Sequence, residues 1–271
     1  MQKRYAPWSK LESDRRWVNI LDEHTPFFLG GYDRGGFPVG SPSQRDLFLA
    51  KPPIHSRALF LNGGSAWVDF GDSAQVINGT TYTLEFWLFP MYCEKWARVF
   101  AQGSTANASQ QVELIFYEGR VLSLFEGSAA PLSPKVTSKP LRLGEWQHIA
   151  IVRNGSSYAL YVNGQLAEDT NPSATVSSSG PTGIGAYNTG VSDQGNFGIC
   201  DFRVWSVART QTQIQDNFKK AIDPATSGLV AYWYFDDGGT TIDDKTSGAR
   251  DGTILGPART TTTYGYFWYP N

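Results

Sequence analysis

Apolar and polar residues alternate along much of the chain from residue 58 onward, which is the pattern of β-strands with one buried face. The clearest example is the segment 82–89, where four apolar residues share one face: Tyr82, Leu84, Phe86 and Leu88. Pro90 follows, and we expect it to end this strand because proline has no N–H to donate to a neighbouring strand. The segment therefore predicts a central, half-buried strand.

Similar but shorter runs are separated by glycine-containing turns. Further strands are expected at 58–61, 66–70, 112–116, 121–125, 146–152, 158–162 and 229–235. Turns at Glu118-Gly119 and Asn154-Gly155 join two pairs of these runs into hairpins, and Asn163-Gly164 is a further turn after 158–162. Asn-Gly tolerates the positive φ angles of a type I′ turn, so two of these turns are expected to be of that type. Short strands at such intervals predict a β-sandwich or barrel.

One helix is expected, near residues 210–222. Thr210 and Gln213 have the spacing of a capping box, and Ile214, Phe218 and Ile222 repeat every four residues along one side. We expect this helix to close one end of the sandwich.

The two ends of the chain have a different composition. Residues 1–57 are rich in proline, glycine and aromatic residues, which disfavours regular structure and predicts an extended arm held by its rings. That arm is expected to lie on its own sandwich or on a neighbouring subunit. The sequence thus divides into an arm at 1–57, a sandwich at 58–256 and an aromatic tail at 257–271.

Composition and charge exclude several classes of protein. A chain of 271 residues can bury a large core as a single domain, and its net charge of −2 offers no basic surface for nucleic acid. No run approaches the roughly 18 apolar residues of a membrane span. The charged N-terminus lacks the apolar region of a secretory signal, so we expect a virion or another surface particle, assembled after intracellular synthesis.

The two cysteines, Cys93 and Cys200, lie far apart in strand-like segments. Buried free thiols are the favoured interpretation, because two cysteines do not make the disulfide framework of a small secreted domain. A single disulfide across the sandwich stays open as the alternative.

The order of these segments resembles laminin-G-like jelly rolls of the concanavalin A-like lectin family. The central resemblance is GEWQHIAIVRNGSSYALYVNGQLAE at 144–168, which is similar to that family's central hairpins. Three other segments match its opening and closing strands in order: ALFLNGGSAWVDFGDS, YTLEFWLFP and FGICDFRVWSVARTQTQIQDNF. The resemblance implies an all-β fold, an antiparallel two-sheet jelly-roll sandwich. Cys200 stands where the family often has Asp, which argues against a metal site on that strand.

The family is mostly non-catalytic and binds glycans, proteins or other cell-surface ligands, so the resemblance implies a binding module. The alternative is a glycoside hydrolase of the same superfamily, which needs two carboxylates across a cleft. Glu85 and Glu113 each stand alone on their strands, and Glu12-Ser13-Asp14 lies outside the sandwich. The histidines His24, His55 and His148 are isolated. We therefore expect no enzyme activity.

Two sets of residues are candidates for binding. Calcium takes oxygen ligands from loops, and the candidate ligands in predicted turns are Asn62, Asp72, Asp236 and Asp237, with Asp243 and Asp244 nearby. Ordinary turn formation by Asp and Asn is the favoured explanation of these residues and needs no ion. Glycan contact requires exposed rings, and the candidates at strand ends or in loops are Trp67, Tyr92, Trp96 and Tyr187. The alternative for these rings is packing in the core.

Two functions are compatible with these features. The first is recognition of a glycan or cell-surface ligand at the loops of the sandwich. The second is a structural or adhesion role in a larger assembly such as a phage virion, as a tail, fibre or capsid decoration. The aromatic arm and tail favour the second, because such segments could contact other subunits.

Overall fold

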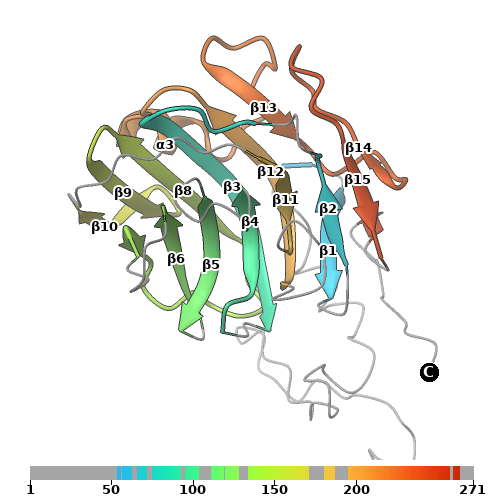
Figure 1. Ribbon diagram of the computed structural model, residues 1–271, viewed down its shortest axis with the longest axis horizontal. Coiled ribbons are helices and arrows are strands. Elements are labelled where there is room, and N and C mark those ends of the chain that lie inside the picture. Colours follow the sequence, from blue (N-terminus) through green and yellow to red (C-terminus); the bar gives the residue numbers. More distant parts are fainter. Residues whose placement is uncertain are drawn as a thin grey trace, which may run out of the picture.

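The computed structural model describes two packed antiparallel sheets and one short helix (Figure 1). It describes residues 54–55, 57–62, 66–71, 75–92, 95–103, 111–118, 120–127, 134–170, 180–186, 195–256 and 259–262. The predicted fold class, an antiparallel two-sheet sandwich, is confirmed.

The first sheet, here the β3 sheet, has the order β10-β9-β8-β3-β12-β1-β16, with β13 also paired to β12. Its strands are β1 (Arg57–Asn62), β3 (Thr81–Tyr92), β8 (Gln147–Asn154), β9 (Ser157–Val162), β10 (Gln165–Thr170), β12 (Asn196–Trp205), β13 (Leu229–Trp233) and β16 (Arg259–Thr262). Because β12 is long, β1 pairs with its first half and β13 with its second half.

The second sheet, here the β5 sheet, has the order β14-β15-β2-β11-β4-β5-β6-β7. Its strands are β2 (Trp67–Asp69), β4 (Arg98–Gln102), β5 (Val112–Glu118), β6 (Val121–Glu126), β7 (Val136–Thr137), β11 (Thr182–Ile184), β14 (Thr241–Ile242) and β15 (Gly252–Leu255). The hairpin predicted from 112–116 and 121–125 is the β5–β6 pair.

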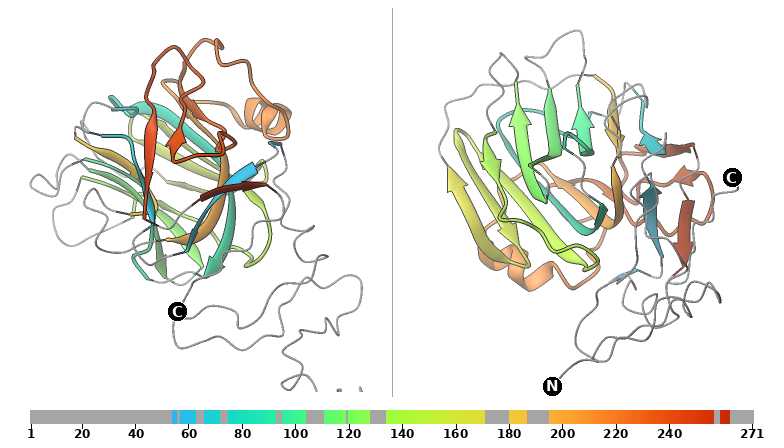
Figure 2. Two further views of the ribbon diagram at one scale, coloured as in Figure 1. Left: turned by 90° about the vertical axis from the view of Figure 1, so that its right-hand side faces the viewer. Right: turned by 90° about the horizontal axis from the view of Figure 1, so that it is seen from below.

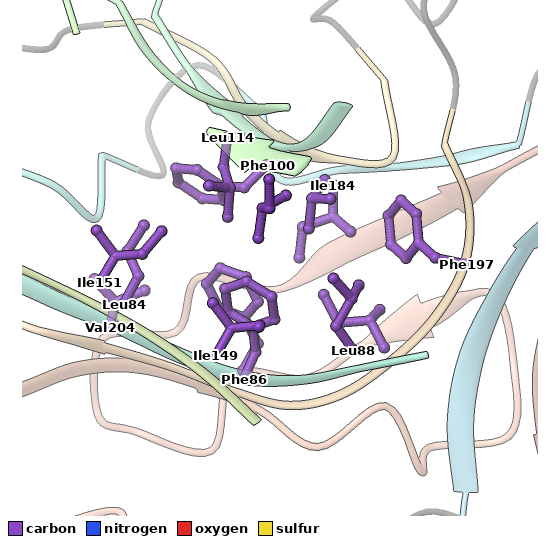
Figure 3. Close-up of a cluster of buried hydrophobic side chains, with 14 of the residues drawn as sticks. Leu84, Phe86, Leu88, Phe100, Leu114, Ile149, Ile151, Ile184, Phe197 and Val204 are labelled. Carbon is purple, nitrogen blue, oxygen red and sulfur yellow. The ribbon is translucent and has the colours of Figure 1, made fainter. Parts of the chain in front are cut away.

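Side chains from both sheets meet in one core (Figure 3). The four residues predicted to share a face of β3 are all buried in this core. Phe86 stacks on Phe202 of β12 with ring centroids 4.9 Å apart, and Phe202 lies 5.5 Å from Phe100 of the opposite sheet. The stack therefore connects the two layers.

The expectation that Pro90 ends its strand was wrong, because β3 continues to Tyr92. Pro90 pairs with Phe197 of β12, where the register shifts between Asn196 and Phe197. A register shift leaves part of the ladder unpaired, so a residue without an N–H is tolerated there.

The Asn163-Gly164 turn has the expected geometry, since both residues have positive φ, 52° and 74°. The turn between β8 and β9 differs. Its central residues are Gly155 and Ser156, because Asn154 pairs with Ser157 at the end of the ladder. Of these two only Gly155 has positive φ, so a type I′ turn does not form.

The helix α3 (Gln211–Asn217) has the predicted capping box: Gln213 N–H donates to Thr210 Oγ1 over 3.2 Å, and Thr210 N–H donates to Gln213 Oε1 over 2.9 Å. It is shorter than expected and ends before Phe218. Ile214 packs against Ala150 and Val152 of β8. The helix thus covers the outer face of the β3 sheet, away from β4–β6, instead of closing one end of the sandwich (Figure 2).

The boundaries of the sandwich also differ from those expected. β16 lies inside the predicted tail and pairs with β1, so the sheet extends to Thr262. At the other end, Ile54 packs against Ala58, Trp87 and Cys200. Residues 1–53 and 263–271 lie outside the described residues, so the predicted arm and tail are largely untested. Cys200 is a buried free thiol, whereas Cys93 is outside the described residues.

A buried charged group ties the two sheets together at one end of the core. Glu126 of β6 forms a 2.7 Å ion pair with Arg153 of β8, and both side chains are almost fully buried. The hydroxyls of Tyr82 and Tyr158 donate to the two oxygens of Glu126. Burial and the Glu126 charge raise the pKa of Tyr82, so its hydroxyl stays protonated as a donor. The cluster joins β6 of one sheet to β3, β8 and β9 of the other.

We expect Arg153→Met to lower the free energy of unfolding by about 3–5 kcal/mol, because it leaves Glu126 as an unpaired buried charge. Arg142→Met is the control, since its pair with Glu145 is exposed and exposed pairs contribute about 0–1 kcal/mol. Denaturation by urea measures both. The double variant Arg153→Met/Glu126→Leu should recover much of the loss; equal, small losses in the two single variants would contradict the assignment.

Candidate functional site

The outer face of the β5 sheet carries an unusual number of nearly buried side chains for a surface that is not part of the core. Leu114, Leu122 and Leu124 point into the core, so the alternate positions of β5 and β6 face outward. Among these outward positions, Ile115 is 1% exposed and Ser123 is 0% exposed. The centre of this face is therefore shielded from solvent.

Aromatic rings gather on this face. The Tyr117 ring lies 5.2 Å from Phe125 and 5.0 Å from Trp96, the latter in an edge-to-face contact with an interplanar angle of 79°. Phe125 is buried, whereas Trp96 and Tyr117 are only half-buried. The Trp96–Tyr117 pair thus presents two partly accessible rings in a fixed mutual geometry, just before β4 begins at Arg98.

Trp96 is held in an unfavourable backbone conformation. Its φ is 74°, in the left-handed region, which costs a residue with a Cβ about 1–2 kcal/mol. Two backbone hydrogen bonds hold the segment there: Trp96 N–H donates to Phe116 O over 2.7 Å, and Phe116 N–H donates to Ala97 O over 2.8 Å. The strain fixes the direction in which the indole ring leaves the backbone.

Charged groups flank the two rings. The exposed Lys95 places Nζ 5.4 Å from the Trp96 ring centroid and 5.5 Å from that of Tyr117. Further along the same face, Arg98 of β4 and Glu113 of β5 form a 3.5 Å ion pair, with each side chain 13% exposed. Apolar rings with a few polar groups at their edges have the composition of a small-molecule binding surface.

A scan against protein-family models matches residues 62–215 to the family described as "Concanavalin A-like lectin/glucanases superfamily", which is more than half of the chain. The chain belongs to this superfamily. A search of curated protein sequences finds no match.

Several solved structures resemble this chain. A proposed carbohydrate-binding protein from Bacteroides ovatus aligns with a TM-score of 0.57 and 19% identity, over 76% of this chain and 60% of that one. Domain 4 of an extracellular arabinanase from Geobacillus stearothermophilus, in complex with arabinotriose, aligns with a TM-score of 0.49 and 20% identity, over 59% of this chain and 75% of that one. The CBM40 domain of a Ruminococcus gnavus sialidase, bound to sialyllactose, aligns with a TM-score of 0.49 and 11% identity, over 59% of this chain and 95% of that one.

Of the four aromatic residues expected to bind ligand, Trp67 and Trp96 have described side chains, and their surroundings differ. Trp67 is on the outer face of β2, in the same sheet as the strand β4 that follows Trp96, but it is 7% exposed and packs on Gly183, where an added Cβ would lie 3.5 Å from the ring. Since β11 separates β2 from β4, these strands are about 10 Å apart. Tyr92 ends β3, but its side chain and all of Tyr187 lie outside the described residues.

The expected calcium ligands are only partly described. Lys245 Nζ donates to Asp237 Oδ1 and lies 3.5 Å from Asp243 Oδ2, so an ammonium group already neutralises these carboxylates. Asp236 is half-buried beside them. No group of three or more His, Cys, Asp and Glu side chains that could hold a metal occurs in the described part of the chain. The Asn62 side chain and Asp72 lie outside it, so calcium there stays a prediction.

Sequence reasoning missed a second charged cluster, on the outer face of the β3 sheet beneath α3. Glu85 of β3 pairs with Arg209, and its other oxygen lies 3.8 Å from Arg203. Arg203 in turn pairs with Asp201 over 2.6 Å, and His55 Nε2 lies 2.9 Å from the same carboxylate. A sequence signal was present, since Glu85 and Arg203 are charged residues within largely apolar runs.

This second cluster has the residue types of an active site but no access to solvent. The side chains of Glu85, Asp201, Arg203 and His148 are all 0% exposed. Burial raises the pKa of Glu85, an effect opposed by Arg209 and Arg203. Burial and then these two arginines lower the pKa of His148 well below its usual value of 6.5, so the imidazole is neutral. The cluster fastens α3 and residue 55 to the sheet.

Within the described ranges, no helix is long and apolar enough to span a membrane.

The buried neutral His148 predicts a loss of stability in acid. Below its unfolded-state pKa of about 6.5 the unfolded chain binds a proton that the folded chain excludes, so stability present above this pH is lost as the pH falls. The expected loss is about 2 kcal/mol between pH 6.5 and pH 5. The raised pKa of Glu85 acts in the opposite direction, so the readout is the difference between wild type and His148→Gln in urea denaturation at each pH. If the free energy of unfolding changes with pH equally in wild type and His148→Gln, His148 is not the source of the loss of stability in acid.

Proposed function

We propose that this chain is a non-catalytic glycan-binding module whose ligand stacks on the Trp96–Tyr117 pair at the outer face of the β5 sheet. One observation carries the proposal: Trp96 is half-buried and kept in a left-handed backbone conformation, which a residue with a Cβ rarely adopts. Strain of this kind is concentrated at functional sites, where a fixed side-chain direction is useful.

The site chemistry and the superfamily both support this proposal. The flat, weakly polar faces of sugars stack on Trp and Tyr rings, while hydroxyls require hydrogen-bonding groups at the edge, such as Lys95 and the Arg98–Glu113 pair. The superfamily contains lectins, and the Bacteroides ovatus protein of the same fold is proposed to bind carbohydrate.

A glycoside hydrolase of the same superfamily is the alternative, and the described carboxylates do not favour it. Hydrolysis uses two accessible carboxyl groups about 5–10 Å apart. On the proposed face, Glu113 is paired with Arg98, and Glu85 on the opposite sheet is buried between two arginines. Neither has the arrangement of an acid with a facing nucleophile or base.

A role in a larger assembly, including a phage virion, is a separate proposal that rests on the arm at 1–57 and the tail. Deletion of residues 1–53 followed by measurement of the oligomeric state tests it. An unchanged monomer would count against the assembly role and would leave glycan binding unaffected.

Glycan binding is tested with an oligosaccharide array, probed with and without calcium, followed by titration of the best ligand. Trp96→Ala and Tyr117→Ala should each weaken binding about tenfold, or about 1.4 kcal/mol, by removing a stacking surface. The control is Trp146→Ala, which removes a half-buried ring from the other sheet. Absence of any array hit in both conditions would refute the proposal.

Trp96→Gly distinguishes the effect of losing the ring from the effect of relieving the backbone strain. It should lose as much affinity as Trp96→Ala, but its free energy of unfolding should exceed that of Trp96→Ala by about 1 kcal/mol, because glycine adopts positive φ without penalty. Equal stability of the two variants would show that Trp96 is not strained.

A further inference from the structure

Lys95 determines which sugars fit the Trp96–Tyr117 pair. We propose that this site recognises an acidic saccharide, with a carboxylate or sulfate placed against the Lys95 ammonium group. The proposal rests on the proposed glycan-binding function and goes beyond it by naming the ligand class.

The position of the cation gives the first reason. Lys95 Nζ lies within 6 Å of both ring centroids, which is the distance range of cation–π attraction. A neutral sugar that stacks on these rings has to displace the ammonium group and offers no charge in return. An acidic sugar also displaces it, but it provides an anion to which the same ammonium group can bind. The arrangement therefore penalises neutral ligands and compensates acidic ones.

The second reason is the balance of charge along the face. Lys95 and Arg98 supply two positive charges and Glu113 supplies one negative charge. Glu113 and Arg98 neutralise each other as an ion pair, so the unbalanced positive charge of these three groups lies at Lys95. These three groups thus fit a saccharide with one acidic residue at the Lys95 end better than a polyanion.

The whole chain carries a net charge of −2, so the attraction is local. Long-range steering of an acidic ligand is not expected, and the affinity should depend only weakly on salt because a single contact pair is involved.

The experiment compares matched oligosaccharides on one array: neutral forms and forms that carry one uronic acid, one sialic acid or one sulfate. The best ligands of wild-type protein should be acidic, and Lys95→Gln should weaken their binding about fivefold in titrations. The same variant should leave neutral oligosaccharides unchanged or bound up to about twofold more tightly, since the displaced cation is gone.

Lys219→Gln is the matched control, because Lys219 is also an exposed lysine over an aromatic ring, 5.1 Å from the Phe218 centroid, on the other sheet. It should change neither class of ligand. Trp96→Ala should weaken both classes.

The outcomes distinguish the two proposals. Exclusively neutral hits, or an acidic-to-neutral affinity ratio that Lys95→Gln does not change, would overturn the acidic-saccharide inference while glycan binding stands. No hits at all, or hits insensitive to Trp96→Ala, would overturn the glycan-binding proposal and this inference with it.

Discussion

The β3 sheet is covered on both of its faces, and much of the structure follows from this constraint. One face forms the common core, while α3, Ile54 and His55 lie on the other. Any charged side chain on that second face is removed from water and has to be paired. Arg203 and Arg209 neutralise Glu85. Arg203 also donates to the carbonyl of Asn217, the last residue of α3, and to that of Lys220, three residues further on. The Arg203 guanidinium therefore neutralises Glu85 of the sheet and also holds the C-terminal end of α3.

The β5 sheet carries the proposed binding surface. Its outer face combines nearly buried apolar positions with a pair of half-buried rings and flanking charges. The asymmetry between the two sheets separates the roles of the charged groups. Those on the β3 sheet support the fold. Lys95 instead lies at the surface, where in our proposal its ammonium group leaves the two rings and binds an acidic ligand.

Local sequence patterns predicted much of the fold because the interactions behind them are local. Each of the correct predictions depends on residues that are close together in the sequence. Examples are the alternation at 82–89, the Asn163-Gly164 turn and the Thr210 capping box. The errors arose where a distant partner decides the outcome. β3 passes through Pro90 because β12 shifts register there. Similarly, Arg209, the ion-pair partner of Glu85, lies 124 residues away in the chain.

The candidate site was less predictable for a physical reason. Composition indicated aromatic residues in loops, but only the backbone conformation distinguishes Trp96, which is strained and half-buried, from Trp67, which packs on Gly183. A positive φ at a tryptophan has no signature in sequence, since glycine and asparagine are the residues that normally indicate it.

The edges of the two sheets have a consequence for behaviour at high concentration. β7 and β14, which end the β5 sheet, contain two residues each, and β10 carries a register shift between Leu166 and Glu168. Such edges expose few consecutive backbone groups to a second molecule. Among the described strands, these three edges therefore give little opportunity for the edge-to-edge polymerisation that converts soluble sandwiches into fibrils.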